Sequence, residues 1–213
     1  MTRRLVSIAL SLPFAVITAL ALRESGFFGI PKLHFQTWGG LQVLMDLVIM
    51  ASLACAWMIL EARDRGGRSW PYVAITLVAG SFGPLSYLAM NKPTEGSTKT
   101  QAPTWMMGHM PRTPWISVLF ITLLFGVLST KALGAHGYFG IWRLQFACWG
   151  ALQVLADLTI LCLLACVWMV QDARKTCVNP WPFLVLTLAA GSFGPLTYLL
   201  IRDRLGVRNV VSN

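Results

Sequence analysis

The sequence predicts an all-α polytopic membrane protein with six transmembrane helices, arranged as two inverted three-helix repeats. Three observations lead to this prediction: the chain is mostly apolar, it contains six long apolar stretches, and its second half repeats its first. Hydrophobic residues make up 56% of the 213 residues and charged residues only 12%. A typical soluble domain has about 25% charged residues, so water is not the main solvent of this chain.

Each of the six apolar stretches holds about 17 or more residues, enough to cross a hydrocarbon core about 30 Å thick as a helix. The stretches cover residues 5–22, 35–60, 70–90, 114–130, 146–170 and 181–201. Every backbone polar group in lipid needs an internal partner, which leaves helices or closed barrels as the spanning structures. Continuous rather than alternating apolarity favours helices.

The two halves of the chain align as an internal repeat. Residues 26–90 match residues 137–201 without a gap at an offset of 111, and about half of the aligned positions are identical. The first apolar stretch falls opposite the fourth, so it belongs to the repeated unit. The predicted organisation is a first repeat at 1–92, a linker at 93–113, a second repeat at 114–204 and a C-terminal tail at 205–213. An odd number of crossings in each repeat predicts that the second repeat is inverted.

The net charge of +9 favours anionic lipid headgroups over nucleic acid as the counterions. Lys and Arg are spread over tails and short loops, without the basic stripe of a nucleic-acid-binding surface. In the inverted arrangement with both termini inside, the inner side carries ten of the 17 Lys and Arg residues and the outer side seven. This bias favours a multi-pass protein of the cell inner membrane with both termini in the cytoplasm.

Two intramembrane acids are the candidate catalytic residues, Asp46 and Asp157. A carboxylate at the centre of a membrane helix costs about 2.5–3.5 kcal/mol even on the lenient insertion scale. Burial favours the protonated form, which suits a general acid or base. Steps of four residues place further polar and aromatic side chains on the same helix face, and we assign them to substrate binding: Trp38 and Gln42 in the first repeat, Trp149 and Gln153 in the second. The alternative is that each Asp or Gln only forms a hydrogen bond between helices.

A Gly-Ser-Phe-Gly-Pro segment interrupts the third apolar stretch of each repeat, at residues 80–84 and 191–195. Proline lacks an amide hydrogen and glycine permits a bend, so the helix is predicted to break there. Such interruptions at matching places in two halves indicate a binding site. We therefore expect Gly83, Pro84, Gly194 and Pro195 to line the same cavity as the Asp of their own repeat. The alternative is a tight helix crossing made of small residues.

The order of these motifs resembles that of small bacterial three-helix membrane domains of unknown function. It resembles less closely the plant and cyanobacterial membrane family needed for neoxanthin synthesis. The similarity covers about 60 residues in each half. A looser likeness in layout is to integral membrane terpene and carotenoid cyclases, which use acidic residues from two related halves, although no cyclase motif matches residue by residue.

These observations support three hypotheses for function. The first is a pocket between the repeats for a hydrophobic small molecule, with isoprenoid or carotenoid modification by Asp46 and Asp157. The second is a proton-coupled small-molecule transporter or channel. The third is a non-catalytic membrane subunit of a larger complex. The expected partners are membrane lipids and a hydrophobic small molecule, with a membrane protein or a second copy of the chain as alternatives. The sequence identifies no cofactor, and its Cys and His spacing predicts no metal site.

Overall fold

The computed structural model describes residues 2–65, 67–90, 115–176 and 178–211, and within these ranges all regular secondary structure is helical. The all-α prediction is therefore confirmed for this part of the chain. The predicted linker, residues 93–113, lies outside the described residues. The helices follow one another as α1 (Thr2–Ser25), α2 (Gly29–His34), α3 (Trp38–Arg65), α4 (Trp70–Ala79), α5 (Phe82–Met90), α6 (Trp115–Gln145), α7 (Trp149–Thr176), α8 (Trp181–Ala190) and α9 (Phe193–Val211).

Four of these helices are long and apolar enough to cross a membrane. They are α1, α3, α6 and α7, with apolar lengths of 19, 26, 31 and 26 residues. The other two predicted spans, 70–90 and 181–201, are not single helices in the structure. Each is divided into two helices, α4 with α5 and α8 with α9.

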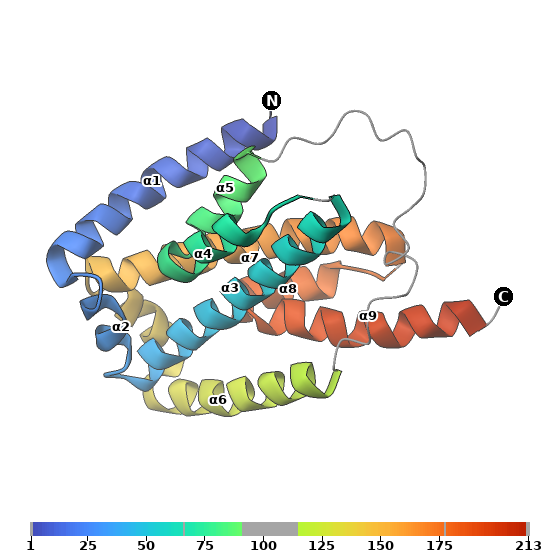
Figure 1. The fold of residues 1–213 in the computed structure, drawn as a ribbon. Coiled ribbons are helices and arrows are strands. Elements are labelled where there is room, and N and C mark those ends of the chain that lie inside the picture. The colour runs from blue at the N-terminus through green and yellow to red at the C-terminus, as the bar shows by residue number, and fades with distance from the viewer. Residues whose placement is uncertain (1, 66, 91–114, 177, 212–213) are drawn as a thin grey trace. The chain divides into compact units, whose positions relative to one another are not determined.

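The break between α4 and α5 reverses the direction of the chain. Gly80 ends α4 with a φ of 62°, and α5 begins two residues later. The rings of Tyr72 on α4 and Tyr87 on α5 lie with their centroids 5.3 Å apart. In one straight helix, these two residues would be about 22 Å apart along the axis. The two helices therefore form a hairpin, whose arms fold back on each other (Figure 1).

The same hairpin recurs 111 residues later in α8 and α9. Gly191 ends α8 with a φ of 63°, and the ring centroids of Phe183 and Tyr198 are 5.3 Å apart. Close backbone approach makes both hairpins tight. A side chain at Gly83 would collide with Thr76 of α4, and one at Gly194 would collide with Thr187 of α8.

The chain divides into two compact units, and the boundaries between them pass through α6 and α7. Unit 1 comprises Met1–Lys92 with Phe125–Leu161, and unit 2 comprises Pro93–Leu124 with Cys162–Asn213. Unit 1 therefore contains the first hairpin together with parts of both sequence repeats. Unit 2 contains the second hairpin.

Within unit 1, the first hairpin packs along α1. The hydroxyl of Ser7 donates a hydrogen bond to the carbonyl oxygen of Leu85 over 2.7 Å. The rings of Phe14 and Phe82 lie 4.7 Å apart. Phe82 is the first residue of α5, and Phe14 stands near the middle of α1, about 16 Å before its last residue. The tip of the hairpin therefore lies level with the middle of a helix long enough to cross a membrane.

Two reciprocal contacts in unit 1 bring matching helix ends of the two repeats together. A side chain at Gly39, at the start of α3, would meet His136, Ile141 and Leu144 near the end of α6. A side chain at Gly150, at the start of α7, would meet the three residues that precede those by 111 positions, namely Ser25, Ile30 and Leu33.

These reciprocal contacts give the predicted inversion no support, and the structure does not confirm it. Two further interactions agree with them: the Lys131 ammonium lies 5.5 Å from the ring of Trp38, and the Trp149 amide donates to the Glu24 carboxylate over 2.9 Å. Inverted repeats would hold these matching ends at opposite membrane surfaces. Here the ends of α1 and α6 and the starts of α3 and α7 meet at one end of unit 1. The predicted inversion depended on a third crossing in each repeat, and the third apolar stretch is divided into two short helices rather than one long one.

Unit 2 is held partly by a polar cluster between α7 and α9. The Asp172 carboxylate accepts a hydrogen bond of 2.8 Å from the Tyr198 hydroxyl. Its two oxygens also lie 3.3 Å from one guanidinium nitrogen of Arg202. This cluster ties the second arm of the second hairpin to the long helix that precedes it.

Candidate functional site

The candidate site lies at the tip of the first hairpin, where Asp157 of α7 meets Ser81. The backbone amide of Ser81 donates to Oδ1 of Asp157 over 2.6 Å. Both residues are buried, with exposed fractions of 0% for Ser81 and 2% for Asp157. In a continuous helix this amide would bond to the carbonyl of Leu77. The carboxylate instead satisfies the amide that the break sets free.

Gly80 makes room for this carboxylate. A side chain at position 80 would overlap the carboxylate of Asp157. The backbone at Gly80 has a positive φ, a conformation that residues other than glycine rarely adopt. The glycine is therefore required twice, for the chain reversal and for the close approach of α7.

The break changes the partners of the polar atoms at the tip. The Ser81 side chain is buried beside the Asp157 carboxylate and interacts with it, as its backbone amide does. The Gly80 amide bonds to the carbonyl of Thr76, and the Ser81 amide bonds to Asp157. The carbonyl of Leu77 consequently lacks its usual helical donor, and so does that of Ala79, because the Gly83 amide bonds to the carbonyl of Gly80.

The structure places the two predicted catalytic acids at matching positions on α3 and α7. Asp46 is buried like Asp157, with an exposed fraction of 3%. Each Asp was predicted to meet the interrupted segment of its own repeat. The contact that Asp157 makes is with the segment of the first repeat, which the sequence did not predict.

The predicted substrate-binding residues on α3 and α7 divide into two groups. Gln42 and Gln153 are half-buried, one turn before the acids. Trp38 and Trp149 stand at the helix starts and are mostly exposed, at 49% and 44%. Eight residues, about 12 Å along the axis, separate each Trp from the Asp of its helix, so the Trp residues lie outside the tip site.

The predicted residues of the interrupted segments are buried within their hairpins. Gly83 and Pro84 lie in the first turn of α5, next to Ser81, while Gly194 and Pro195 occupy the same positions in α9. Gly83 and Gly194 contact the preceding arm rather than an open cavity. Each of these two glycines therefore allows the two arms of its own hairpin to approach closely.

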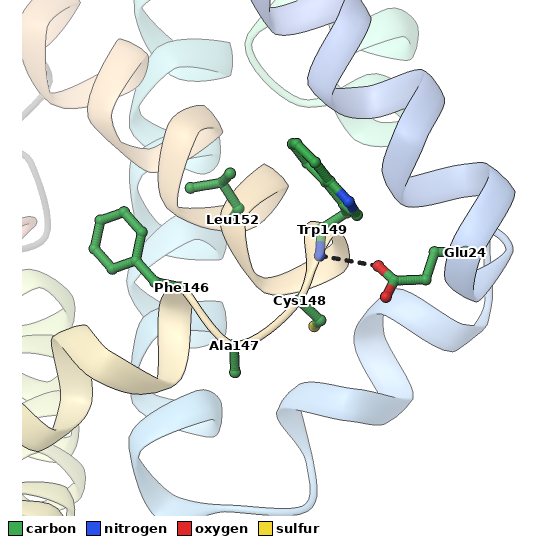
Figure 2. Close-up of a pocket in the computed structure, with 6 residues that line it drawn as sticks. All are labelled: Glu24, Phe146, Ala147, Cys148, Trp149 and Leu152. Atoms are coloured by element: carbon green, nitrogen blue, oxygen red, sulfur yellow. Dashed lines mark hydrogen bonds between the residues drawn. The ribbon is translucent and has the colours of Figure 1, made fainter.

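A separate hollow of about 300 Å³ lies at the end of unit 1 where the matching helix ends meet. It is lined by Glu24, Phe146, Ala147, Cys148, Trp149 and Leu152. Figure 2 shows the Glu24 carboxylate reaching the backbone amide of Trp149, which begins α7. This hollow does not include Asp157 or Ser81, so it is distinct from the tip site.

The sequence analysis did not identify Ser81 as the partner of Asp157, nor the pairing of Asp172 with Arg202. Both contacts join residues far apart in the chain, 76 positions in the first case and 30 in the second. One signal for the contact of Ser81 with Asp157 was present in the sequence: both repeats contain a Gly-Ser pair at the helix break and an Asp in the preceding apolar stretch. Comparison of the chain with protein-family models, curated proteins and solved structures found no match.

Proposed function

We propose that this chain is an integral membrane protein with two parallel repeats. Each repeat would contribute two crossing helices and one hairpin that enters and leaves the bilayer on the same side. The lengths of the first hairpin support this arrangement, because α4 has 10 residues and α5 has nine. Each of these two arms is therefore about 15 Å long, half of a hydrocarbon core of about 30 Å. A folded hairpin of that length reaches the middle of the membrane and returns. In the second hairpin α8 also has 10 residues, whereas α9 has 19 and continues past the apolar stretch that ends at residue 201.

The distribution of basic residues supports the parallel arrangement. One side would contain only four of the 17 Lys and Arg residues of the chain, namely Arg23, Lys32, Lys131 and Arg143. The other 13 would share the side of the two termini and the hairpin bases. This imbalance is much larger than the ten to seven of the inverted arrangement. By the positive-inside rule, the termini and the hairpin bases would face the cytoplasm.

We propose further that the protein moves a small polar solute or ion across the membrane, past the tip of the hairpin. The observation that carries this proposal is the break between α4 and α5, which lies level with the middle of α1 and is hydrogen-bonded to a buried carboxylate. In the proposed arrangement this is the middle of the membrane. Irregular backbone at this depth is tolerated where it is buried in protein or lines a water-filled cavity. Broken helices and intramembrane acids are recurrent parts of transport sites.

The same geometry gives less support to acid–base catalysis on an isoprenoid or carotenoid. A general acid or base needs its oxygen within hydrogen-bond reach of the substrate proton. One oxygen of Asp157 already accepts a hydrogen bond from the Ser81 amide. Asp157 therefore stabilises the backbone at the hairpin tip. The hypotheses of a lipophilic substrate and of a non-catalytic subunit stay predictions from the sequence.

Flux into sealed vesicles tests the transport proposal. The purified chain is reconstituted into liposomes, and the entry of protons, sodium ions, glycerol and amino acids is compared with entry into empty vesicles. We expect faster entry of at least one probe, and a several-fold loss of that entry in Asp157→Asn. The matched control is Glu24→Gln, since Glu24 also accepts a backbone amide but lies outside the tip. Entry of every probe at the rate of empty vesicles would contradict the proposal.

A further inference from the structure

The last residues of α6 form a short helical segment beyond a kink. The helix has 31 residues and is interrupted at Gly137, where φ is 66° and ψ is 166°. The part of α6 before Gly137 is about 33 Å long, which already matches a hydrocarbon core of about 30 Å. In the proposed membrane arrangement, residues 138–145 therefore lie at the membrane surface, at the level of the lipid headgroups.

This segment has two different faces. One face carries Ile141 and Leu144, which lie against the start of α3 at Gly39. The other face carries side chains spaced three and four residues apart, which places them on one side of the helix. These side chains are exposed and line a hollow of about 600 Å³, and they are Phe139, Trp142, Arg143 and Phe146.

The chemistry of the hollow matches a phospholipid. Aromatic rings at the headgroup level are typical contacts of a membrane interface, and the rings of Phe139 and Phe146 are 81% and 66% exposed, so acyl chains can cover them. The Arg143 guanidinium can donate two parallel hydrogen bonds to phosphate oxygens. Arg143 is the one charged residue among the four that line the hollow, so the lining carries a charge opposite to that of a phosphate.

The corresponding segment of the first repeat differs in two of these groups. Pro31 and Lys32 stand where the second repeat has Trp142 and Arg143, while both aromatic positions at the ends of the set are Phe in each repeat. Proline offers no flat ring, and a Lys ammonium binds phosphate as a point charge rather than through paired bonds. The combination of Trp and Arg is therefore a property of the second repeat.

We propose that the hollow lined by Phe139, Trp142, Arg143 and Phe146 binds one anionic phospholipid. The phosphate lies on Arg143 and an acyl chain lies against the aromatic rings. A net negative lipid is favoured over a zwitterionic one, because the latter would bring a second cation close to Arg143. This inference rests on the proposed membrane arrangement and is independent of the proposed transport.

Lipid-dependent thermal stability tests the site on the full-length protein in detergent. A ligand that binds only the folded state raises the unfolding midpoint in a saturable manner, and we expect this for phosphatidylglycerol. Diacylglycerol, which lacks the phosphate, and phosphatidylcholine, which is zwitterionic, should have smaller effects. Inorganic phosphate at constant ionic strength should have none, because it lacks the acyl chains. Native mass spectrometry counts the phosphatidylglycerol molecules that stay bound.

Variants locate the lipid on the molecule. Arg143→Gln should weaken the apparent affinity for phosphatidylglycerol several-fold and reduce the retained lipid by one molecule, and Arg143→Lys should lose part of the affinity. The matched control is Lys32→Gln, which removes the same charge at the corresponding position of the first repeat. This control should respond to phosphatidylglycerol like the wild type.

The outcomes are separable. Equal losses in Arg143→Gln and Lys32→Gln would overturn the site and indicate a general attraction of the basic chain to anionic lipid. Equal effects of phosphatidylglycerol and phosphatidylcholine, or of inorganic phosphate alone, would overturn it as well. If Arg143→Gln does not fold, the lipid retained by Arg143→Lys and by the wild type decides the question. Lipid bound at Arg143 without flux into vesicles would support the site and contradict transport alone.

Discussion

Gly80 illustrates how much of this fold depends on single backbone positions. Its φ of 62° and that of Gly191, 63°, reverse the chain at the two hairpin tips. The carboxylate of Asp157 occupies the space where a side chain at position 80 would lie. One residue thus determines both the direction of the chain and the access of an acid to the backbone amide of Ser81, which the helix break leaves without a carbonyl partner.

Replacement of Gly80 by alanine should destabilise the protein strongly. A positive φ costs a residue with a side chain about 1–3 kcal/mol, and the new methyl group would also displace Asp157. The control is Gly126→Ala, because a side chain at Gly126 in α6 meets nothing within 4 Å. That change should be neutral or stabilising by up to about 1 kcal/mol. Thermal unfolding in detergent measures both, and similar midpoints for the two variants would contradict this account of the tip.

The polar cluster of unit 2 gives a second prediction for a single residue. Tyr198→Phe removes the hydroxyl that donates to Asp172 over 2.8 Å. A hydrogen bond to a charged group contributes about 1.5–3 kcal/mol, so the free energy of unfolding should fall by that amount. Tyr72→Phe is the matched control, since the corresponding position of the second repeat is already Phe183. An unfolding free energy for Tyr198→Phe equal to that of Tyr72→Phe would show that the hydrogen bond is not stabilising.

At the scale of the element, the helix breaks were predictable from sequence and the hairpins were not. Glycine and proline at residues 80–84 indicate a break, which the structure confirms at Gly80. The same residues suit a kink within one crossing helix as well as a reversal. The reversal depends on the contact of Gly83 with Thr76 and on the ring pair of Tyr72 and Tyr87. These are tertiary contacts, and they cannot be predicted from the apolar composition of residues 70–90.

Cross-linking distinguishes the hairpin from a kinked crossing helix. Cysteines replacing Tyr72 and Tyr87, in a background without other thiols, should be joined by a short bifunctional reagent because their rings are in contact. Val78 paired with Tyr87 is the control, since the Val78 side chain is 68% exposed and should react without joining. Mass spectrometry of the digested protein identifies the linked peptides. Failure of the first pair to link while both thiols react singly would indicate an extended α4–α5.

For the whole molecule, the direction of the second repeat follows from what the third apolar stretch does. Counted as a crossing, it makes three per repeat and inverts the second copy. Folded as a hairpin, it makes two and leaves the copies parallel. The sequence contains a hint in favour of the parallel arrangement that we propose, because this arrangement would leave only four Lys and Arg residues on one side. The charge distribution could be interpreted in this way only after the hairpin was known, since the side on which each loop lies depends on how many crossings precede it.

Labelling of matched positions tests the parallel arrangement. Single cysteines replace Arg68 and Asn179, which are exposed and precede α4 and α8 at the same repeat position, and Phe28 and Phe139, which are 84% and 81% exposed. The background lacks the native cysteines. A thiol reagent that cannot cross membranes is added to sealed vesicles of each orientation.

Two parallel copies give a definite pattern of labelling. Positions 68 and 179 should react from one side, the cytoplasmic side by the charge imbalance, and positions 28 and 139 should react from the other. Inverted copies would instead separate 68 from 179 and 28 from 139, because each matched pair would then face opposite surfaces. The pairs at the two ends control for each other, since a leaky vesicle labels all four positions from both sides. Reaction of 68 and 179 from opposite sides of intact vesicles would therefore restore the inverted arrangement and remove the basis for two hairpins that enter from the same side.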